Sequence, residues 1–263
     1  MPLIPVTSIE DSRLAHYREL SSRNLTRQSG LFIAEGEKVV ERLIASGFEI
    51  ASLLAEPSFA ERYQSRVTAD TPIYVVSRDV LENTIGFNFH RGILACGHRK
   101  PPTSVGDFLT KLSRPKATII ACPDVRDPTN LGSIIRSTAA FGCDAILLGR
   151  QCADPFSRRV LRVSMGSALH IPIIESRDIM ADAKTVAAAD FELVAAVLDS
   201  TAEPLNVAKR KNRMVLLLGG EGHGLSAEWL ELAQRKVTIP MQLGIDSLNV
   251  AVAAAVLLYH FCR

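Results

Sequence analysis

Short apolar segments alternate regularly with helical segments over residues 117–218, and this alternation constrains the fold more than any other feature of the chain. Strands that are apolar on both faces are typical of parallel sheets that helices cover on both sides. The pattern therefore predicts an α/β fold. Strands are expected at 117–122, 145–148, 171–174, 192–197 and 214–218, and helices at 130–141, 155–163 and 177–189.

A smaller αβ unit is expected before residue 100. Its apolar runs predict strands at 31–34, 50–55, 73–76 and 92–97, and the segments between them predict helices at 37–46, 56–65 and 78–83. The double proline at 101–102 cannot comfortably continue a strand or a helix, so we expect a linker there. The predicted domains are an N-terminal α/β domain at 1–100, a linker at 101–115 and a second domain at 116–263.

The net charge of the chain is only +2, so any contact with nucleic acid must come from local basic patches. Such patches are the arginines of residues 13–27, the group Arg158, Arg159 and Arg162, and the run Lys209–Arg213. Each of them is either a solvated face or a surface for phosphates. Aromatic residues make up 6% of the chain, which argues against a platform on which single-stranded bases stack.

The five cysteines are an odd number without a Cys-x-x-Cys pair, as is typical of proteins in a reducing compartment. This usage predicts no structural zinc and no other metal site. The N-terminus lacks the features of a signal peptide, and the longest apolar run, 250–259, is far shorter than the roughly 20 residues of a membrane helix. A soluble, cytoplasmic protein is expected.

A polar loop follows the strand expected at 117–122 and leads into a helix, within the stretch 123–142. Thr129 or Asn130 could cap this helix, because such side chains accept hydrogen bonds from the first helical amides. Capping alone would be enough to account for Asn130.

Arg136 lies six residues into the same helix, among apolar neighbours. Arginine is rarely buried without a partner. We expect its guanidinium either in an ion pair with Asp124 or Asp127, or in a cleft where it binds a phosphate or a ribose.

A glycine-rich loop, Gly219–Ser226, follows the strand expected at 214–218. Gly222, Gly224 and Ala227 imitate a dinucleotide-binding fingerprint, which would indicate a nicotinamide dehydrogenase. That fingerprint belongs to the first βαβ unit of a larger sheet, whereas only one strand and one helix remain after this loop.

Two polar side chains of the glycine-rich loop are candidates for function. Glu221 either bonds backbone amides or orders a loop that faces a substrate. His223 is either a base or a solvated side chain.

A second short strand is expected to end at Pro240, within Ile239-Pro-Met241, and a Ser247-Leu-Asn249 turn opens a helix of small residues. Serine or aspartate before an apolar helix is an ordinary cap. The small side chains would let this helix pack closely, against another chain for example. The ends of two strands and the start of a helix at one edge predict a ligand pocket.

Taken in order, these segments resemble the three motifs of the SpoU (TrmH-like) RNA ribose methyltransferases of the SPOUT superfamily. The resemblance covers residues 116–263, and the front half, with residues 23–25 and 31–36, is similar to the small RNA-binding domain that many members carry before the catalytic domain. Gly220 departs from the pattern, since motif two usually has asparagine there. The matching residues are Asn130, Gly132, Arg136, Phe141 and Gly142 in motif one, Gly219, Glu221, Gly222, Gly224, Leu225 and Ser226 in motif two, and Ile239–Met241 with Ser247–Val250 in motif three.

The resemblance implies a SPOUT-type parallel sheet whose C-terminal segment ties a deep trefoil knot, a rare exception among folds. It also implies a homodimer with the active site near its interface. S-adenosyl-methionine would bind in the knot, and the resemblance assigns the cofactor to Gly219, Gly220, Glu221, Gly224, Ile239, Met241 and Leu248.

The reaction implied is transfer of a methyl group to a ribose 2′-hydroxyl, with ribosomal RNA as the expected substrate. The catalytic residues would be Arg136, Asn130, Glu221, Ser247 and Asn249. A protonated arginine cannot be a base, so Arg136 would act by polarising the hydroxyl or through a lowered pKa. Two alternatives stay open, a transfer RNA substrate and a non-catalytic RNA-binding or ribosome-assembly protein.

Overall fold

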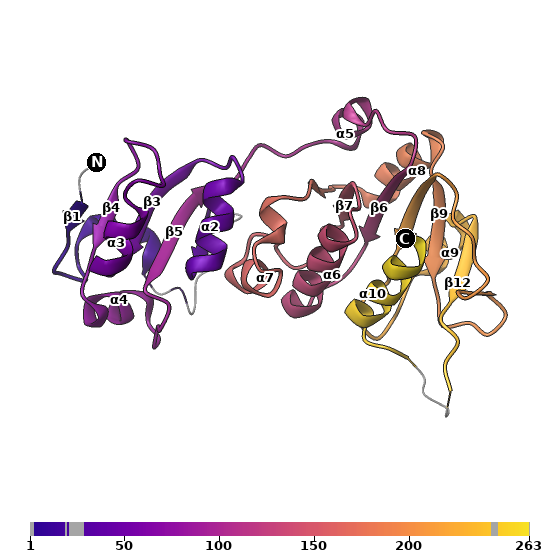
Figure 1. Ribbon diagram of the computed structural model, residues 1–263. Coiled ribbons are helices and arrows are strands. Elements are labelled where there is room, and N and C mark those ends of the chain that lie inside the picture. The colour runs from indigo at the N-terminus through magenta and orange to yellow at the C-terminus, as the bar shows by residue number, and fades with distance from the viewer. Residues whose placement is uncertain (1–2, 19, 21–28, 243–246, 263) are drawn as a thin grey trace. The chain divides into compact units, whose positions relative to one another are not determined.

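The computed structural model describes residues 3–18, 20, 29–242 and 247–262 (Figure 1). The chain divides into two compact units, one of residues 1–100 with 156–170 and one of residues 101–155 with 171–263. The expected linear division had placed 156–170 in the second domain, whereas this segment groups with the first unit. No helix among the described residues is long and apolar enough to cross a membrane.

The first unit is built on a mixed five-stranded sheet in the order β1-β4-β3-β5-β2. β1, β4 and β3 run parallel, while β5 is antiparallel to both β3 and β2. The strands are β1 (Leu3–Pro5), β2 (Leu31–Glu35), β3 (Ile50–Ala55), β4 (Ile73–Val75) and β5 (Ile93–His98). The helices are η1 (Ser12–Tyr17), α2 (Glu37–Ala45), α3 (Pro57–Tyr63), α4 (Arg78–Ile85), α7 (Arg158–Val163) and η2 (Ser167–Leu169).

The second unit is built on a seven-stranded sheet in which every described pair of neighbours is parallel, in the order β10-β12-β9-β11-β6-β7-β8. Its strands are β6 (Ala117–Cys122), β7 (Ala145–Leu148), β8 (Ile173–Glu175), β9 (Glu192–Ala196), β10 (Glu203–Pro204), β11 (Arg213–Leu217) and β12 (Arg235–Thr238). Its helices are α5 (Val105–Lys111), α6 (Pro128–Ala140), α8 (Ile179–Ala188), α9 (Ala227–Leu232) and α10 (Val250–Phe261). The expected α/β fold with a parallel sheet is confirmed.

Several elements have other bounds than expected, and some were not expected at all. The helix expected at 155–163 begins only at Arg158, because the Ser157 side chain accepts from the backbone of Val160 and caps it there. The strand expected to end at Pro240 ends at Thr238. The expected linker contains α5, where Ser104 caps the helix and Val105 and Phe108 are buried. The short strands β1 and β10 were not expected.

The order of the strands locates the crevice of the second unit. From β6 the chain moves outward through β7 to β8, and it then crosses to the other side of β6 for β9, β11 and β12. In open α/β sheets a reversal of this kind separates the loops at the carboxyl ends of two central strands, and ligands bind there. The loops that follow β6 and β11 therefore mark the position of a site.

Candidate functional site

Three side chains from distant segments form one chain of hydrogen bonds at this edge. The side-chain amide of Asn249 donates to Oδ1 of Asn130 over 2.9 Å, and the amide of Asn130 donates to Oε1 of Glu221 over 2.8 Å. The other carboxylate oxygen of Glu221 accepts from the backbone N–H of Arg126 at 3.3 Å. The structure thus brings together one residue from each of the three sequence motifs.

Helix capping explains why these side chains face one another. Asp127, and not Thr129 or Asn130 as expected, caps α6 by accepting from the backbone amides of both of those residues at 2.8 and 2.9 Å. The side chain of Asn130 is therefore available for Glu221. Asn249 caps α10 through its oxygen, which accepts from the amide of Ala251 at 2.9 Å, so that its NH₂ group can donate to Asn130.

Two glycines let the loop after β11 pack directly against backbone. A Cβ atom on Gly219 would lie 2.3 Å from the carbonyl carbon of Gly224, and one on Gly220 would lie 2.2 Å from the backbone oxygen of Asp124. Neither distance is possible without a shift of the backbone. The departure from the family pattern at Gly220 thus has a steric reason, because the loop after β6 occupies the space of a side chain.

Two adjoining pockets open at the carboxyl ends of β9, β11 and β12. The first is mainly apolar, and its lining includes Leu218, Ile239, Met241, Leu248, Val250 and Leu257. The second has a volume of about 590 Å³, in the usual range for small-molecule sites, and its polar lining includes Asp199, Glu221, His223, Ser247 and Asn249. The two pockets share six lining residues, Ala196, Val197, Leu198, Gly224, Leu248 and Val250.

The expected site residues can now be placed. Every residue assigned to the cofactor lines one of the two pockets: Gly219, Gly220, Glu221, Gly224, Ile239, Met241 and Leu248. Of the expected catalytic residues, Glu221, Ser247 and Asn249 line the second pocket, and Asn130 bonds two of them.

Arg136 is not part of this constellation. It is exposed on α6, lines neither pocket and has no hydrogen-bond or ion-pair partner among the residues that the structure describes. The expected ion pair with Asp124 or Asp127 is wrong, because Asp124 pairs with Arg126 at 2.7 Å and Asp127 caps the helix. Burial was also wrongly expected, since the buried face of α6 carries Leu131, Gly132, Ile134, Ile135 and Thr138.

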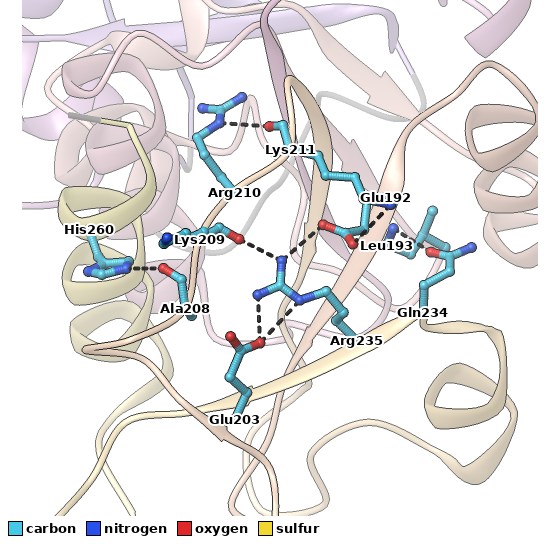
Figure 2. A network of polar contacts seen from close by, with 10 residues as sticks. All are labelled: Glu192, Leu193, Glu203, Ala208, Lys209, Arg210, Lys211, Gln234, Arg235 and His260. Carbon is cyan, nitrogen blue, oxygen red and sulfur yellow. Dashed lines mark hydrogen bonds and ion pairs between the residues drawn. The ribbon is translucent and has the colours of Figure 1, made fainter.

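The segment 197–212 between β9 and β11 is held in place by the polar network of Figure 2. The guanidinium of Arg235 donates to Glu203 at 2.6 Å, to Glu192 at 3.1 Å and to the backbone oxygen of Lys209 at 2.6 Å. His260 on α10 contacts the backbone oxygen of Ala208 at 2.7 Å. These contacts anchor a segment whose first residues line both pockets.

Sequence reasoning missed the part of the lining that comes from β9 and the segment after it, residues 196–199, and it also missed Lys236. A usable signal existed, because residues 197–199 follow a buried strand just as the glycine-rich loop does. Only the strand order, with β9 beside β11, shows that both strand ends meet at one edge.

The basic patches are largely engaged within the protein. Arg210 donates to the backbone oxygens of Ala117 and Phe261, and Lys211 pairs with Glu192 at 3.4 Å. In the N-terminal patch, Arg13 pairs with Asp11, and Arg18 donates to the backbone oxygens of Ile9 and Asp11. Arg23 and Arg27 lie outside the described residues.

An apolar pocket next to a polar network, at the carboxyl edge of a parallel sheet, defines a class of α/β protein. Such a protein binds a largely apolar small molecule beside groups that orient a second, polar reactant. Residues 117–259 match the SpoU rRNA Methylase family, and residues 12–85 match the MRM3-like substrate binding domain. The chain belongs to the SpoU rRNA methylase family and is an RNA methyltransferase, so the nicotinamide interpretation of Gly222–Ala227 is wrong.

Relatives and solved structures agree over nearly the whole chain. It is 37% identical to an uncharacterized tRNA/rRNA methyltransferase of Mycobacterium tuberculosis, over 97% of this chain and 90% of that protein. It is 28% identical to the 23S rRNA (guanosine(2553)-2′-O)-methyltransferase RlmP of Bacillus subtilis, over 97% and 98% of the two chains. The AdoMet-bound rRNA methyltransferase from Sinorhizobium meliloti has a similar structure, with a TM-score of 0.85, 26% identity and coverage of 98% and 97%.

Proposed function

We propose that this chain transfers the methyl group of S-adenosyl-methionine to the 2′-hydroxyl of a ribose in ribosomal RNA. The observation that carries the proposal is the hydrogen-bonded set Asn249, Asn130 and Glu221 at the polar pocket, which adjoins the apolar one. Support for the substrate comes from RlmP and from the 23S rRNA (guanosine-2′-O-)-methyltransferase RlmB of Acinetobacter baylyi, which is 31% identical over 71% of this chain. We also propose that the reaction takes place in the cytoplasm.

The residues at the pocket fit the proposed methyl donor. Aliphatic side chains such as Ile239 and Leu248 offer apolar walls to an adenine ring, and the glycines Gly219 and Gly224 expose backbone to its polar edge. A neighbouring solved structure, AviRb from Streptomyces viridochromogenes in complex with AdoMet, shares the fold with a TM-score of 0.80. When bound, the donor would supply an electrophilic methyl group, which would bond to the ribose oxygen as its bond to sulfur breaks and S-adenosyl-homocysteine leaves.

In this proposal the polar network orients the nucleotide. Asn130 is fixed on both sides, by Glu221 and by Asn249, and a fixed donor and acceptor set lowers the entropic barrier of an in-line displacement. Ser247 and Asn249 line the pocket where the ribose would bind. Arg136 would polarise the ribose hydroxyl by donating a hydrogen bond to its oxygen, and the hydroxyl proton would pass to water, since a protonated guanidinium cannot accept a proton.

The position of Arg136 leads us to propose a homodimer in which this residue serves the pocket of the second copy. Helix α10 packs against α6, the helix of Arg136 (Figure 1). The outer face of α10 exposes Val252, Val256 and Tyr259 at helical spacing, with exposed fractions of 50%, 39% and 48%. Burying this stripe against a second copy would remove apolar surface from water on the helix that packs against α6.

We also propose that the chain is knotted. The segment 197–212 pairs with β12 through β10, and its residues Ala208 and Arg210 contact His260 and Phe261 of α10. The knot that the family resemblance implies would then form where β12 and α10 lie against this segment. The first unit would be the RNA-binding domain and residues 101–115 its linker.

The test is methyl transfer from tritiated S-adenosyl-methionine to unmodified 23S rRNA transcript, with the product mapped for 2′-O-methylation. We expect transfer to a single ribose and none to a transfer RNA mixture. If the protein does not bind S-adenosyl-methionine and does not transfer its methyl group, it is instead an RNA-binding or ribosome-assembly protein.

A mixing experiment tests the shared site. Arg136→Ala and Asn130→Asp subunits are each expected to be strongly impaired, whereas their mixed dimer would contain one intact site and recover activity above that of either variant alone. If mixing restores nothing while both variants still dimerise, Arg136 does not act across the interface.

A further inference from the structure

The first unit contains a buried carboxylate that three arginines surround. Glu35 at the end of β2 is only 4% exposed. Its main partner is Arg158 on α7, which donates to Oε2 at 3.0 and 3.2 Å and also to the backbone oxygen of Leu20. Arg158 is the least exposed of the three arginines, at 20% of its side chain, and it compensates the buried charge.

The other two arginines are held more loosely. Arg91 and Arg162 approach the second oxygen of Glu35 at 3.4 and 3.6 Å, and 48% and 42% of their side chains remain exposed. Both approach the same carboxylate oxygen, so two positive groups lie near one another. The single negative charge between them, that of Glu35, is already paired with Arg158. The repulsion between them favours an additional anion.

A pocket of about 390 Å³ opens at these two arginines, and Lys38, Phe59 and His90 also line it. Gly36 makes room for one of them, because a Cβ atom there would lie 2.7 Å from Cδ of Arg91. The other acidic side chain of the lining, Glu37, is paired with Arg62 at 2.9 Å. The pocket therefore has an excess of positive charge on side chains that are partly exposed.

We propose that this pocket binds a phosphate of the RNA backbone and that Arg91 and Arg162 are its principal contacts. The inference rests on the proposed RNA substrate and names where the first unit holds it. Guanidinium groups present parallel N–H donors that match two phosphate oxygens, and Arg91 and Arg162 have such donors exposed. Residues Glu35, Lys38 and Phe59 lie in the segment that matches the substrate binding domain.

The test compares Arg91→Gln and Arg162→Gln with Arg13→Gln. Arg13 is a matched control, since it lies in the same unit, is also paired with a carboxylate and is 42% exposed like Arg162. Binding of a fluorescent 23S rRNA transcript is measured at several salt concentrations. Each pocket variant is expected to weaken binding roughly 5-fold and to lower the slope of log K against log salt by about 0.7–0.9. RNA binding by the Arg13→Gln protein should equal that of the wild type. The affinity for S-adenosyl-methionine should stay unchanged in all three variants.

The possible failures are distinguishable. Wild-type affinity and slope in both pocket variants would overturn this inference alone, and a wild-type protein that binds no RNA would overturn the proposed substrate as well. Titration with inorganic phosphate distinguishes a site for RNA phosphates from a site for a free phosphate ion. If Arg162→Gln abolishes phosphate binding but leaves RNA binding intact, the pocket serves a small anion and the inference is wrong. Melting temperatures confirm that the variants are folded.

Discussion

Asn249 donates a hydrogen bond to Asn130, which lies 119 positions earlier in the sequence, and Asn130 in turn donates a hydrogen bond to Glu221. Each contact pairs a donor with an acceptor in a fixed direction. The amide of Asn130 must donate to the carboxylate while its oxygen accepts from Asn249. This polarity makes the arrangement testable by substitutions that barely change the size of the side chains.

Asn130→Asp should lower the rate of methyl transfer roughly 10- to 100-fold, because a carboxylate would face Glu221 and displace both side chains. The double variant Asn130→Asp with Glu221→Gln exchanges amide and carboxylate and preserves every hydrogen bond of the network. It should recover much of the lost rate, and the coupling can be measured in a double-mutant cycle.

Asn83→Asp is the matched control, since Asn83 is exposed on α4 in the first unit. It should leave the rate unchanged. Equal rates for the single and double variants at the network would mean that the polarity of these bonds does not matter for the reaction.

The site could be predicted from sequence only in part. The strands at 50–55, 117–122 and 145–148 have the expected bounds because each is a mostly apolar run. The three motifs could be assigned to one edge because parallel strands end there together. The sequence analysis did not predict that Arg136 lies on the exposed face of α6. The buried positions of this helix recur with helical period, and Arg136 is not one of them.

Other features of the site depend on tertiary contacts that no local pattern contains. The cap of α6 is Asp127, which frees Asn130, and the choice among three adjacent capping residues is made by the packing of the loop. The close approach of Asp124 to Gly220 joins two loops that are almost a hundred residues apart. Neither could be predicted from propensity or spacing.

Gly220→Asn, which restores the residue usual at this place in the family, should destabilise this protein. The new Cβ would lie 2.2 Å from the backbone oxygen of Asp124, and relieving such overpacking typically costs about 1–3 kcal/mol. The measurement is the free energy of unfolding in urea.

Gly222→Asn provides the control in the same loop. Gly222 has φ of +82°, and a Cβ atom there would meet none of the described residues within 4 Å. Asparagine also tolerates such left-handed backbone better than most residues. The loss at position 220 should clearly exceed that at 222. An equally stable Gly220→Asn protein would show that the two loops separate readily.

Cys262 at the end of α10 should react with iodoacetamide at neutral pH. Contact with the Cys143 sulfur at 3.8 Å, followed by Thr118 and the charge of Arg210, lowers the pKa of the Cys262 thiol from 9.0 to about 6. Its thiolate is therefore populated at pH 7, whereas burial raises the pKa of Cys152 to about 11 and keeps that thiol unreactive.

The same shift gives a pH dependence of stability. Since the folded pKa is lowered, the contribution to folding is complete above about pH 9 and is lost as the pH falls toward 6. Cys143→Ala should raise the pKa of Cys262, slow its alkylation at pH 7 and flatten the stability profile between pH 6 and 9. Identical alkylation rates with and without Cys143 would contradict the assignment.

Arg235→Lys should weaken the binding of S-adenosyl-methionine while the maximal rate changes little. Arg235 joins Glu203, Glu192 and the backbone of Lys209, and so fixes the segment that lines both pockets (Figure 2). Lysine keeps the charge but cannot form these contacts from one planar fork. We expect the Kd for S-adenosyl-methionine to rise roughly 3- to 10-fold, because a looser segment must be ordered when the methyl donor binds. Calorimetry measures the Kd, and Arg177→Lys, at an exposed position of the same unit, is the control. An unchanged Kd with a lowered rate would instead place the effect of Arg235 on the RNA side of the site.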